Sequence, residues 1–413
     1  MSNRLLRRAL AALLPLALQA SLFTLVSCSP EPPLHLYDAQ EAEMHMPVIA
    51  LSLEVYWDYE IAPYESYDWR NEWFYGWDDE DRRIFGELGY VEPTVYNLRR
   101  YYTGQEAYAP HSGVVSNTFT GTTFSGRYDW GFWDILCWNQ ITTLDGVQSL
   151  IFDERTSLDS VVAYTNPSMY TSRYQAPRYT NAFYAPEPLF SAYEQGIEIN
   201  RNLEGFTYDP VRNIYYRRLT MKLLPITYIY LTQVIIHHNN GRIAAVDGSS
   251  NLSGLARTTN VNTGTGGDDA ITVYYSSRLK HNLPLLPYSR TVLAGAKGAS
   301  KAAEEADVEI VDIVGGRLMT FGLCNQTANR IKHHSEVTDR HRHYMDVTMQ
   351  FQNGLDSTFV FDVTDQVRRM YKGGIITVEL DMDTIPIPTR SGGSGFNAVV
   401  EETKDGGTHE FNI

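Results

Sequence analysis

Cysteine is scarce in this chain of 413 residues, which has only three of them. Cys28 stands at the end of an apolar N-terminal stretch, whereas Cys137 and Cys324 lie far apart in the sequence. That separation excludes a local metal knuckle, and two cysteines are too few for a disulfide scaffold. One long-range disulfide and two buried thiols both fit the sequence, and two buried thiols are the favoured interpretation.

Basic residues are also in short supply, with 34 lysines and arginines against 49 aspartates and glutamates. The resulting formal charge of −15 repels nucleic acids and anionic membrane surfaces. We therefore expect no nucleic-acid partner.

Enzyme signatures are missing as well. The sequence has neither the Gly-x-Ser-x-Gly of a nucleophile elbow nor the His-Glu-x-x-His of a zinc peptidase. The glycine-bearing stretches 264–267 and 295–298 lack the phosphate-loop pattern. Without a recognisable nucleophile and base, we predict a protein that has no catalytic residue, needs no cofactor and is not an enzyme.

The N-terminus predicts export. Three arginines precede an apolar run over residues 9–26, and the run stops at Ser27-Cys28, which is the layout of a secretory signal. Leu25-Val26-Ser27-Cys28 resembles the lipobox of bacterial lipoproteins, which implies cleavage before Cys28 and attachment of fatty-acyl chains to it. The alternative is an ordinary signal peptide with an incidental cysteine. We predict a signal peptide over 1–27 and Cys28 as the site of lipid attachment.

Beyond a predicted tether over 28–46, alternating apolar residues from Ile49 to Trp57 predict a strand with one buried face. Residues 59–90 are rich in aromatics and acids without a clear period, so an ordered loop or short helix is expected there. Residues 165–212, with scattered prolines and tyrosines, are interpreted as long loops. Further strands are expected near 92–98, 114–121, 129–138, 147–153, 159–164, 213–221, 226–236, 243–246, 345–351, 359–363 and 375–380, and short helices at 301–306 and 364–370.

Turn residues complete the fold prediction. Asn239-Asn240-Gly241 and Asn353-Gly354 each stand between two apolar runs, a pattern that predicts β-hairpins. Many short strands with turns between them are typical of sandwiches and barrels. The chain is longer than a domain with a single hydrophobic core usually is. We therefore predict an all-β protein with two β-sandwich domains, over 47–222 and 223–413.

Five fragments stand out along the chain: Trp133-Asp134-Ile135-Leu136-Cys137-Trp138-Asn139, Asn251-Leu252-Ser253-Gly254-Leu255-Ala256, Phe361-Asp362-Val363-Thr364-Asp365-Gln366-Val367, Gly373-Gly374-Ile375-Ile376 and Phe396-Asn397-Ala398-Val399-Val400. Together they resemble segments of the fimbrillin-like lipoproteins of Bacteroidota, the group that contains type V pilus subunits and their anchors. The resemblance implies two transthyretin-like β-sandwiches in tandem and a lipid-anchored position at the surface of the outer membrane. The motifs themselves have structural interpretations: a turn after Leu252, and a helix cap from Asp362 or Thr364.

The resemblance implies a fimbrial anchor, accessory subunit or adhesin, with the membrane, pilus subunits or ligands on host or bacterial surfaces as partners. In its polymerising members an arginine-specific protease removes the first strand, and the next subunit supplies a replacement. Arg70 and Arg99-Arg100 are the candidate cleavage points here, and an anchor would keep the strand. The alternative function is glycan binding by exposed aromatics over 67–77.

Two clusters are weighed as metal sites. His341 and His343 would share one face of a strand and reach the same ion, but a third ligand is not evident. The acidic run 78–81 lacks the spaced ligands and the glycine of a calcium loop. We interpret both as ordinary polar positions, the acidic run as a solvated face, and predict no metal ligand.

Overall fold

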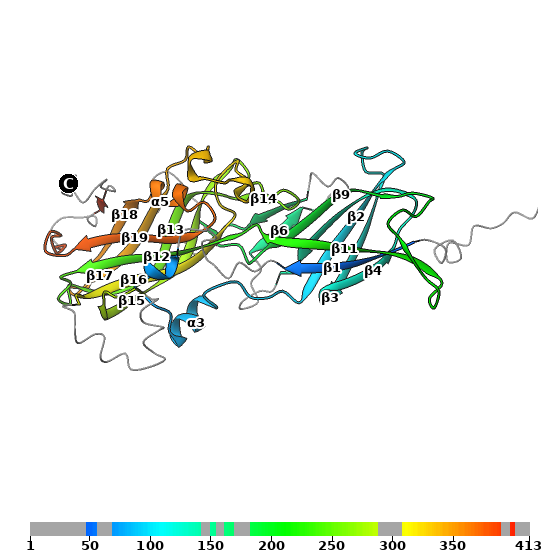
Figure 1. Ribbon diagram of the computed structural model, residues 1–413. Coiled ribbons are helices and arrows are strands. Elements are labelled where there is room, and N and C mark those ends of the chain that lie inside the picture. The colour runs from blue at the N-terminus through cyan, green and yellow to red at the C-terminus, as the bar shows by residue number, and fades with distance from the viewer. Residues whose placement is uncertain are drawn as a thin grey trace, which may run out of the picture.

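The computed structural model describes residues 47–55, 68–141, 149–153, 161–168, 182–287, 308–389 and 397–400. Strands dominate this part of the chain, which confirms the predicted all-β class, and Figure 1 shows them in two large groups that lie end to end. No helix among the described residues is long and apolar enough to cross a membrane. The predictions for the signal peptide, Cys28, the tether and the helix at 301–306 lie outside the described residues. The helical elements are η1 (Trp69–Asn71), α3 (Asp79–Phe85), η3 (Ala328–Arg330), η4 (His334–Glu336) and α5 (Thr364–Arg369).

The first large sheet has eight strands in the order β3-β2-β5-β9-β11-β1-β4, with β10 paired to β11. Alternate apolar residues of β2, β5, β9 and β11 form one core, with Tyr96, Ile135 and Phe190 among its members. The strands are β1 (Val48–Val55), β2 (Val95–Gly104), β3 (Gly113–Thr120), β4 (Thr123–Arg127), β5 (Gly131–Asn139), β9 (Phe190–Ile199), β10 (Thr207–Asp209) and β11 (Ile214–Pro225).

β9 corrects the prediction of loops over 165–212. It pairs with the interior strand β5, but the register shifts between Glu194 and Ile197, and Gly196 there has a φ of 67°. Such a bulge breaks the two-residue alternation that marks a strand in the sequence.

The second large sheet has nine strands in the order β19-β12-β16-β15-β13-β17-β18-β20, with β8 paired to β15. β15 pairs with β13 through residues 270–276 and with β16 through residues 277–284. Tyr230 of β12 and Met345 of β17 enter the same core, so the sheet folds over on itself as a sandwich. The strands are β8 (Ala182–Tyr184), β12 (Tyr228–His237), β13 (Ile243–Ala256), β15 (Ala270–Pro284), β16 (Ile310–Thr320), β17 (Tyr344–Phe351), β18 (Asp356–Asp362), β19 (Gly374–Asp381) and β20 (Asn397–Val400).

A three-stranded sheet, in the order β14-β7-β6, lies beside a smaller core that the two large sheets share. Its strands are β6 (Leu150–Asp153), β7 (Val162–Thr165) and β14 (Thr258–Asn260). Trp138 of β5 and Phe321, next to β16, belong to this shared core. The two large sheets are therefore joined by buried apolar contacts.

The two predicted hairpins have different outcomes. Asn353-Gly354 joins the antiparallel strands β17 and β18, with a φ of 76° at Gly354, and this prediction is confirmed. Residues 239–241 also form a turn, with positive φ at Asn240 and Gly241. However, β12 pairs with β16 and β19, whereas β13 pairs with β15 and β17. The turn thus takes the chain between two layers of the sandwich, and the hairpin prediction is wrong.

The predicted domain boundary near residue 222 lies within β11, and β12 then begins the second sheet. Two earlier segments also reach the second sheet: β8 pairs with β15, and the segment around Trp73 packs on β12. The division into domains over 47–222 and 223–413 stays a prediction.

Candidate functional site

The first strand, β1, is an interior strand of the first sheet. It pairs in parallel with β11 from Val48 opposite Tyr216 to Val55 opposite Leu223, and antiparallel with β4. Ile49 is fully buried in the core of this sheet. The predicted strand is therefore confirmed, and its loss would expose the backbone of two neighbouring strands, which is the condition for strand addition.

The candidate cleavage points lie in ordered structure. Arg99 and Arg100 stand in the middle of β2, which pairs with β3 on one side and β5 on the other. The Arg100 side chain is buried, donates hydrogen bonds to Arg127 O and Asn117 Oδ1, and stacks over the Tyr128 ring. A protease would have to open the sheet to reach this bond.

Arg70 is placed differently, in the short helix η1, which lies in the sequence between β1 and β2 of the first sheet. Its guanidinium lies over the ring of Trp69, 4.9 Å from the centroid, and pairs with Asp68. The neighbouring Trp69 is itself buried against the second sheet. Cleavage after Arg70 would therefore also disturb packed structure.

The aromatics proposed for glycan binding cover the outer face of β12 and β16. Trp73 and Tyr75 are fully buried there, and Trp77 is partly buried in the same cluster. Gln233 of β12 holds the segment by its amide: Oε1 accepts from the backbone N–H of Phe74 at 2.9 Å. The glycan-binding alternative requires exposed rings, whereas Trp69, Trp73 and Tyr75 are core residues, since apolar burial on a strand face outweighs solvent exposure for such rings.

The acidic run 78–81 begins helix α3 with a capping box, in which the Asp78 and Asp81 side chains each accept from the backbone N–H of the other. Asp81 is fully buried, pairs with Lys280 and Arg278 of β15, and accepts the Tyr75 hydroxyl at 2.8 Å. The interpretation as a solvated face is therefore wrong for Asp81, whose charge fixes the segment to the second sheet.

Two of the family-like motifs meet at His343. Ser253 and Gly254 form a bulge in β13 rather than the expected turn, since the register with β15 shifts between Ser253 and Leu255. Gly254 has a φ of 85°, and a Cβ there would lie 2.7 Å from Nδ1 of His343, so only glycine fits. In the second motif, Thr364 Oγ1 accepts from the backbone N–H of His343 at 2.9 Å.

Asp362 supports the start of α5 as the sequence suggested. Its Oδ1 accepts from the backbone N–H of Thr364, the first residue of the helix, at 3.1 Å. The Thr364 hydroxyl does not cap the helix, because it accepts from the backbone N–H of His343 instead. These motif residues are thus structural.

His341 and His343 converge on Asp339, which sequence reasoning did not select. His341 Nδ1 lies 2.6 Å from Asp339 Oδ1, and His343 Nε2 lies 2.9 Å from Asp339 Oδ2. Both histidines precede β17 instead of standing on a strand, so the expected common strand face is not present. Burial alone would raise the pKa of Asp339, but the hydrogen bonds from His343 and His341 outweigh it and hold that pKa below its usual value.

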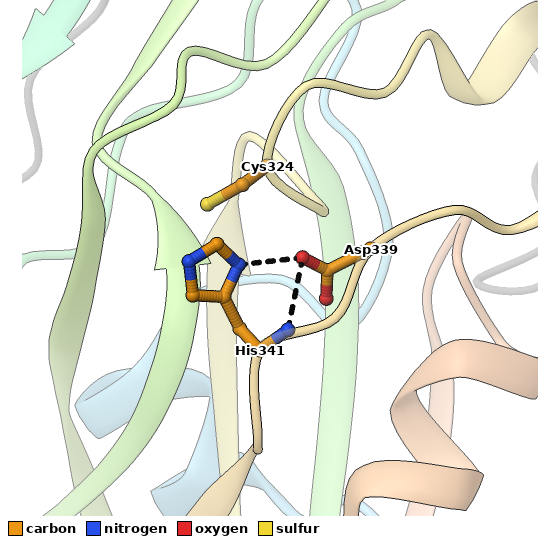
Figure 2. Close-up of side chains that lie close together, drawn as sticks. All are labelled: Cys324, Asp339 and His341. Atoms are coloured by element: carbon orange, nitrogen blue, oxygen red, sulfur yellow. Dashed lines mark hydrogen bonds and ion pairs between the residues drawn. The ribbon is translucent and has the colours of Figure 1, made fainter.

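Cys324 lies beside this group, within 4.8 Å of ligand atoms of Asp339 and His341 (Figure 2). Cys137 and Cys324 are both free and buried, which confirms the interpretation as two buried thiols. Burial raises the pKa of each thiol to about 12. Asp339 contributes further to the increase at Cys324.

His237 is the last residue of β12, His238 follows it, and both lie beside acidic side chains. His237 Nδ1 lies 2.7 Å from Glu309, and His238 Nδ1 lies 2.9 Å from Asp381. The hydrogen bond with Asp381 raises the pKa of His238. His238, Asp381 and Asp383 also bring possible ligand atoms together, but on the exposed surface.

No protein-family model matches the chain, and no curated protein matches it. Among solved structures, it is similar to a candidate adhesin of Bacteroides ovatus, with a TM-score of 0.44, 12% identity, and coverage of 83% of this chain and 94% of that one. It is also similar to the fimbrial anchor protein Mfa2 of Porphyromonas gingivalis, with a TM-score of 0.37, 11% identity, and coverage of 88% and 95%. The names of these two neighbours, an adhesin and a fimbrial anchor, are those of the class of protein that the sequence fragments resemble.

Proposed function

We propose that the chain is a non-catalytic surface lipoprotein that serves as an anchor or accessory subunit of a fimbrium, or as an adhesin. Lipid on Cys28 would hold it in the outer membrane, with the tether over 28–46 between lipid and fold. The lipobox-like residues support the anchor, and the motifs spread along the chain support the fimbrial class.

The observation that carries the proposal is the place of β1. An anchor keeps its first strand, and here that strand follows the tether directly and fills the position between β11 and β4. Pairing on both sides makes β1 part of the fold, so the chain needs no strand from another subunit at this place. A surface that binds a neighbouring subunit would then lie away from the position of β1 between β11 and β4.

The arginines that follow β1 support the same choice. Arg100 is buried in a strand paired on both sides, and Arg70 belongs to a helix turn whose neighbour Trp69 is packed. Protease processing usually takes place at exposed, locally unfolded segments. Removal of β1 at these arginines is therefore disfavoured.

The test is the N-terminus of the protein at the cell surface. Intact cells are labelled with a membrane-impermeant reagent, and the labelled protein is purified and analysed by mass spectrometry. An N-terminus at an acylated Cys28 is expected, and Arg70→Lys is the matched control that should leave it unchanged. An N-terminus immediately after Arg70, or after any arginine beyond β1, would instead indicate a polymerising subunit.

A further inference from the structure

The strongest unassigned cluster is formed by Cys324, Asp339 and His341, whose possible ligand atoms all lie within 4.8 Å of one another. Cys324 comes from the segment after β16, and the other two come from the segment before β17. Figure 2 shows the Asp339 carboxylate facing His341, with the Cys324 side chain above the imidazole ring. Together they present a thiol, a carboxylate and an imidazole.

Among metal ions, zinc is the one that this set of three side chains suits best. Thiolate, imidazole and carboxylate are the three ligand types of zinc sites, with bonds of about 2.0–2.3 Å. A tetrahedron with such bonds places its ligand atoms about 3.3–3.6 Å apart, a spacing that this cluster reaches by small side-chain movements. Hard ions such as Ca²⁺ and Mg²⁺ require oxygen-rich shells, which a cysteine and a histidine do not provide.

The Asp339 carboxylate has a second hydrogen-bond partner besides His341, as carboxylate ligands in metal sites usually have. Asp339 Oδ2 faces His343 Nε2 at 2.9 Å, and the other ring nitrogen of His343 faces Ser253 O at 3.1 Å. His343 is fully buried, and Gly254 leaves room for its ring. This outer contact fixes the orientation of Asp339 and leaves Oδ1 directed at His341.

Gln326 fixes the backbone at the same place. Its Oε1 accepts from the backbone N–H of Asp339 at 3.2 Å and from that of Thr338 at 3.1 Å. Because Gln326 is two residues from Cys324, this contact ties together the two segments that carry the cluster. The arrangement is thus fixed by hydrogen bonds that do not use the three proposed ligand atoms.

We propose that Cys324 Sγ, Asp339 Oδ1 and His341 Nδ1 bind a zinc ion. Binding uses the neutral tautomer of His341, with its proton on Nε2 and the Nδ1 lone pair on the metal, and it releases the proton of the Cys324 thiol to solvent. The His341 side chain is about one-third exposed, at 34%, so a water molecule completes the tetrahedron from the solvent side. The His238 cluster is less suited, because its side chain is 56% exposed and it contains no thiol.

The test uses the whole purified chain, stripped with a chelator and titrated with Co²⁺ and then Zn²⁺. Co²⁺ bound by Cys324 gives a thiolate-to-metal absorption band in the near ultraviolet, which Zn²⁺ then removes by displacement. Cys324→Ala should abolish the band. His341→Ala should weaken zinc binding by more than the roughly 100-fold that loss of an outer-shell partner costs.

Two matched controls keep the result specific. Cys137→Ala removes the other buried thiol, and His238→Ala removes the other candidate cluster. Both should keep the band and the zinc affinity. Unchanged circular dichroism of the metal-free variants separates loss of a ligand from loss of the fold. Absence of a thiolate band in the folded native chain, or equal zinc affinity in native chain and Cys324→Ala, would overturn the proposal.

Discussion

Gly315 of β16 lies directly beneath the ring of Tyr75, so that a Cβ on Gly315 would stand 2.4 Å from the ring atom Cγ. Tyr75 belongs to a segment that precedes β2 of the first sheet, whereas Gly315 is in the second sheet. The absence of a side chain at Gly315 therefore provides the space in which a distant aromatic packs on the strand.

Substitution Gly315→Ala should destabilise the fold, since the new methyl group overlaps the Tyr75 ring and forces the segment away from β16. We expect a decrease of about 1–3 kcal/mol in the free energy of unfolding, the usual range for overpacking. Urea unfolding followed by tryptophan fluorescence measures it. Gly113→Ala is the control, because a Cβ at Gly113 meets nothing within 4 Å. Equal stability of the two variants would show that the segment does not pack on β16.

Asp81 tests the ionic attachment of the same segment. Asp81→Asn removes the buried negative charge that faces Lys280 and Arg278, and we expect a loss of about 3 kcal/mol in the free energy of unfolding. The control is Asp79→Asn, whose side chain is 99% exposed and should change stability by less than about 0.5 kcal/mol. Comparable small effects from both substitutions would contradict a buried ion pair at Asp81.

Asp346 should give the fold a pH dependence. It is buried in β17, and burial raises its pKa from 3.8 to about 7, although Asn251 donates a hydrogen bond that acts in the opposite direction. Because the folded-state pKa is the higher one, the stabilisation is complete below about pH 3.8 and is lost as the pH rises toward 7. The slope is about 1.4 kcal/mol per pH unit within that window.

The measurement for Asp346 is the stability difference between the native chain and Asp346→Asn at several pH values. The asparagine variant keeps the shape but does not titrate, so it should gain on the native chain steadily between pH 4 and pH 7. Subtraction cancels the contributions of the other carboxyl groups. A constant difference across this window would contradict a raised pKa at Asp346.

Local patterns predicted those elements whose cause is local. The alternation after Pro47 predicted β1, and Asn353-Gly354 predicted the β17–β18 hairpin, because turn geometry and a buried face are encoded in a few residues. The turn at 239–241 was also found, but its strands pair with partners far away in the sequence. Register with distant strands is a property of the whole sheet and is not encoded in the turn.

The longer strands were missed for a related reason. β16 is buried on both faces along nearly its whole length, and the register of β15 with β16 shifts between Lys280 and Leu283. Such strands lose the simple two-residue period. An ordered loop or short helix was predicted for the aromatic segment, and η1 and α3 confirm it for the described residues, but its place on β12 was not predictable because its partner Gln233 is 159 residues from Phe74.

The zinc cluster was visible only in part. The spacing of His341 and His343 indicated that the two histidines could share a ligand. Asp339 stands two residues before His341, so an aspartate close to paired histidines was the signal that the sequence offered. Cys324 could not be added from the sequence, since its approach depends on how the segment after β16 folds against the segment before β17.

Cellular fractionation of Cys28→Ala tests the central claim most directly. The native chain should be found in the outer membrane and should be degraded when intact cells are treated with protease. The variant, with no thiol for the lipid, should be exported yet recovered in the soluble fraction with its sandwich fold intact. A variant that stays in the outer membrane as firmly as the native chain would contradict a lipid-anchored surface protein.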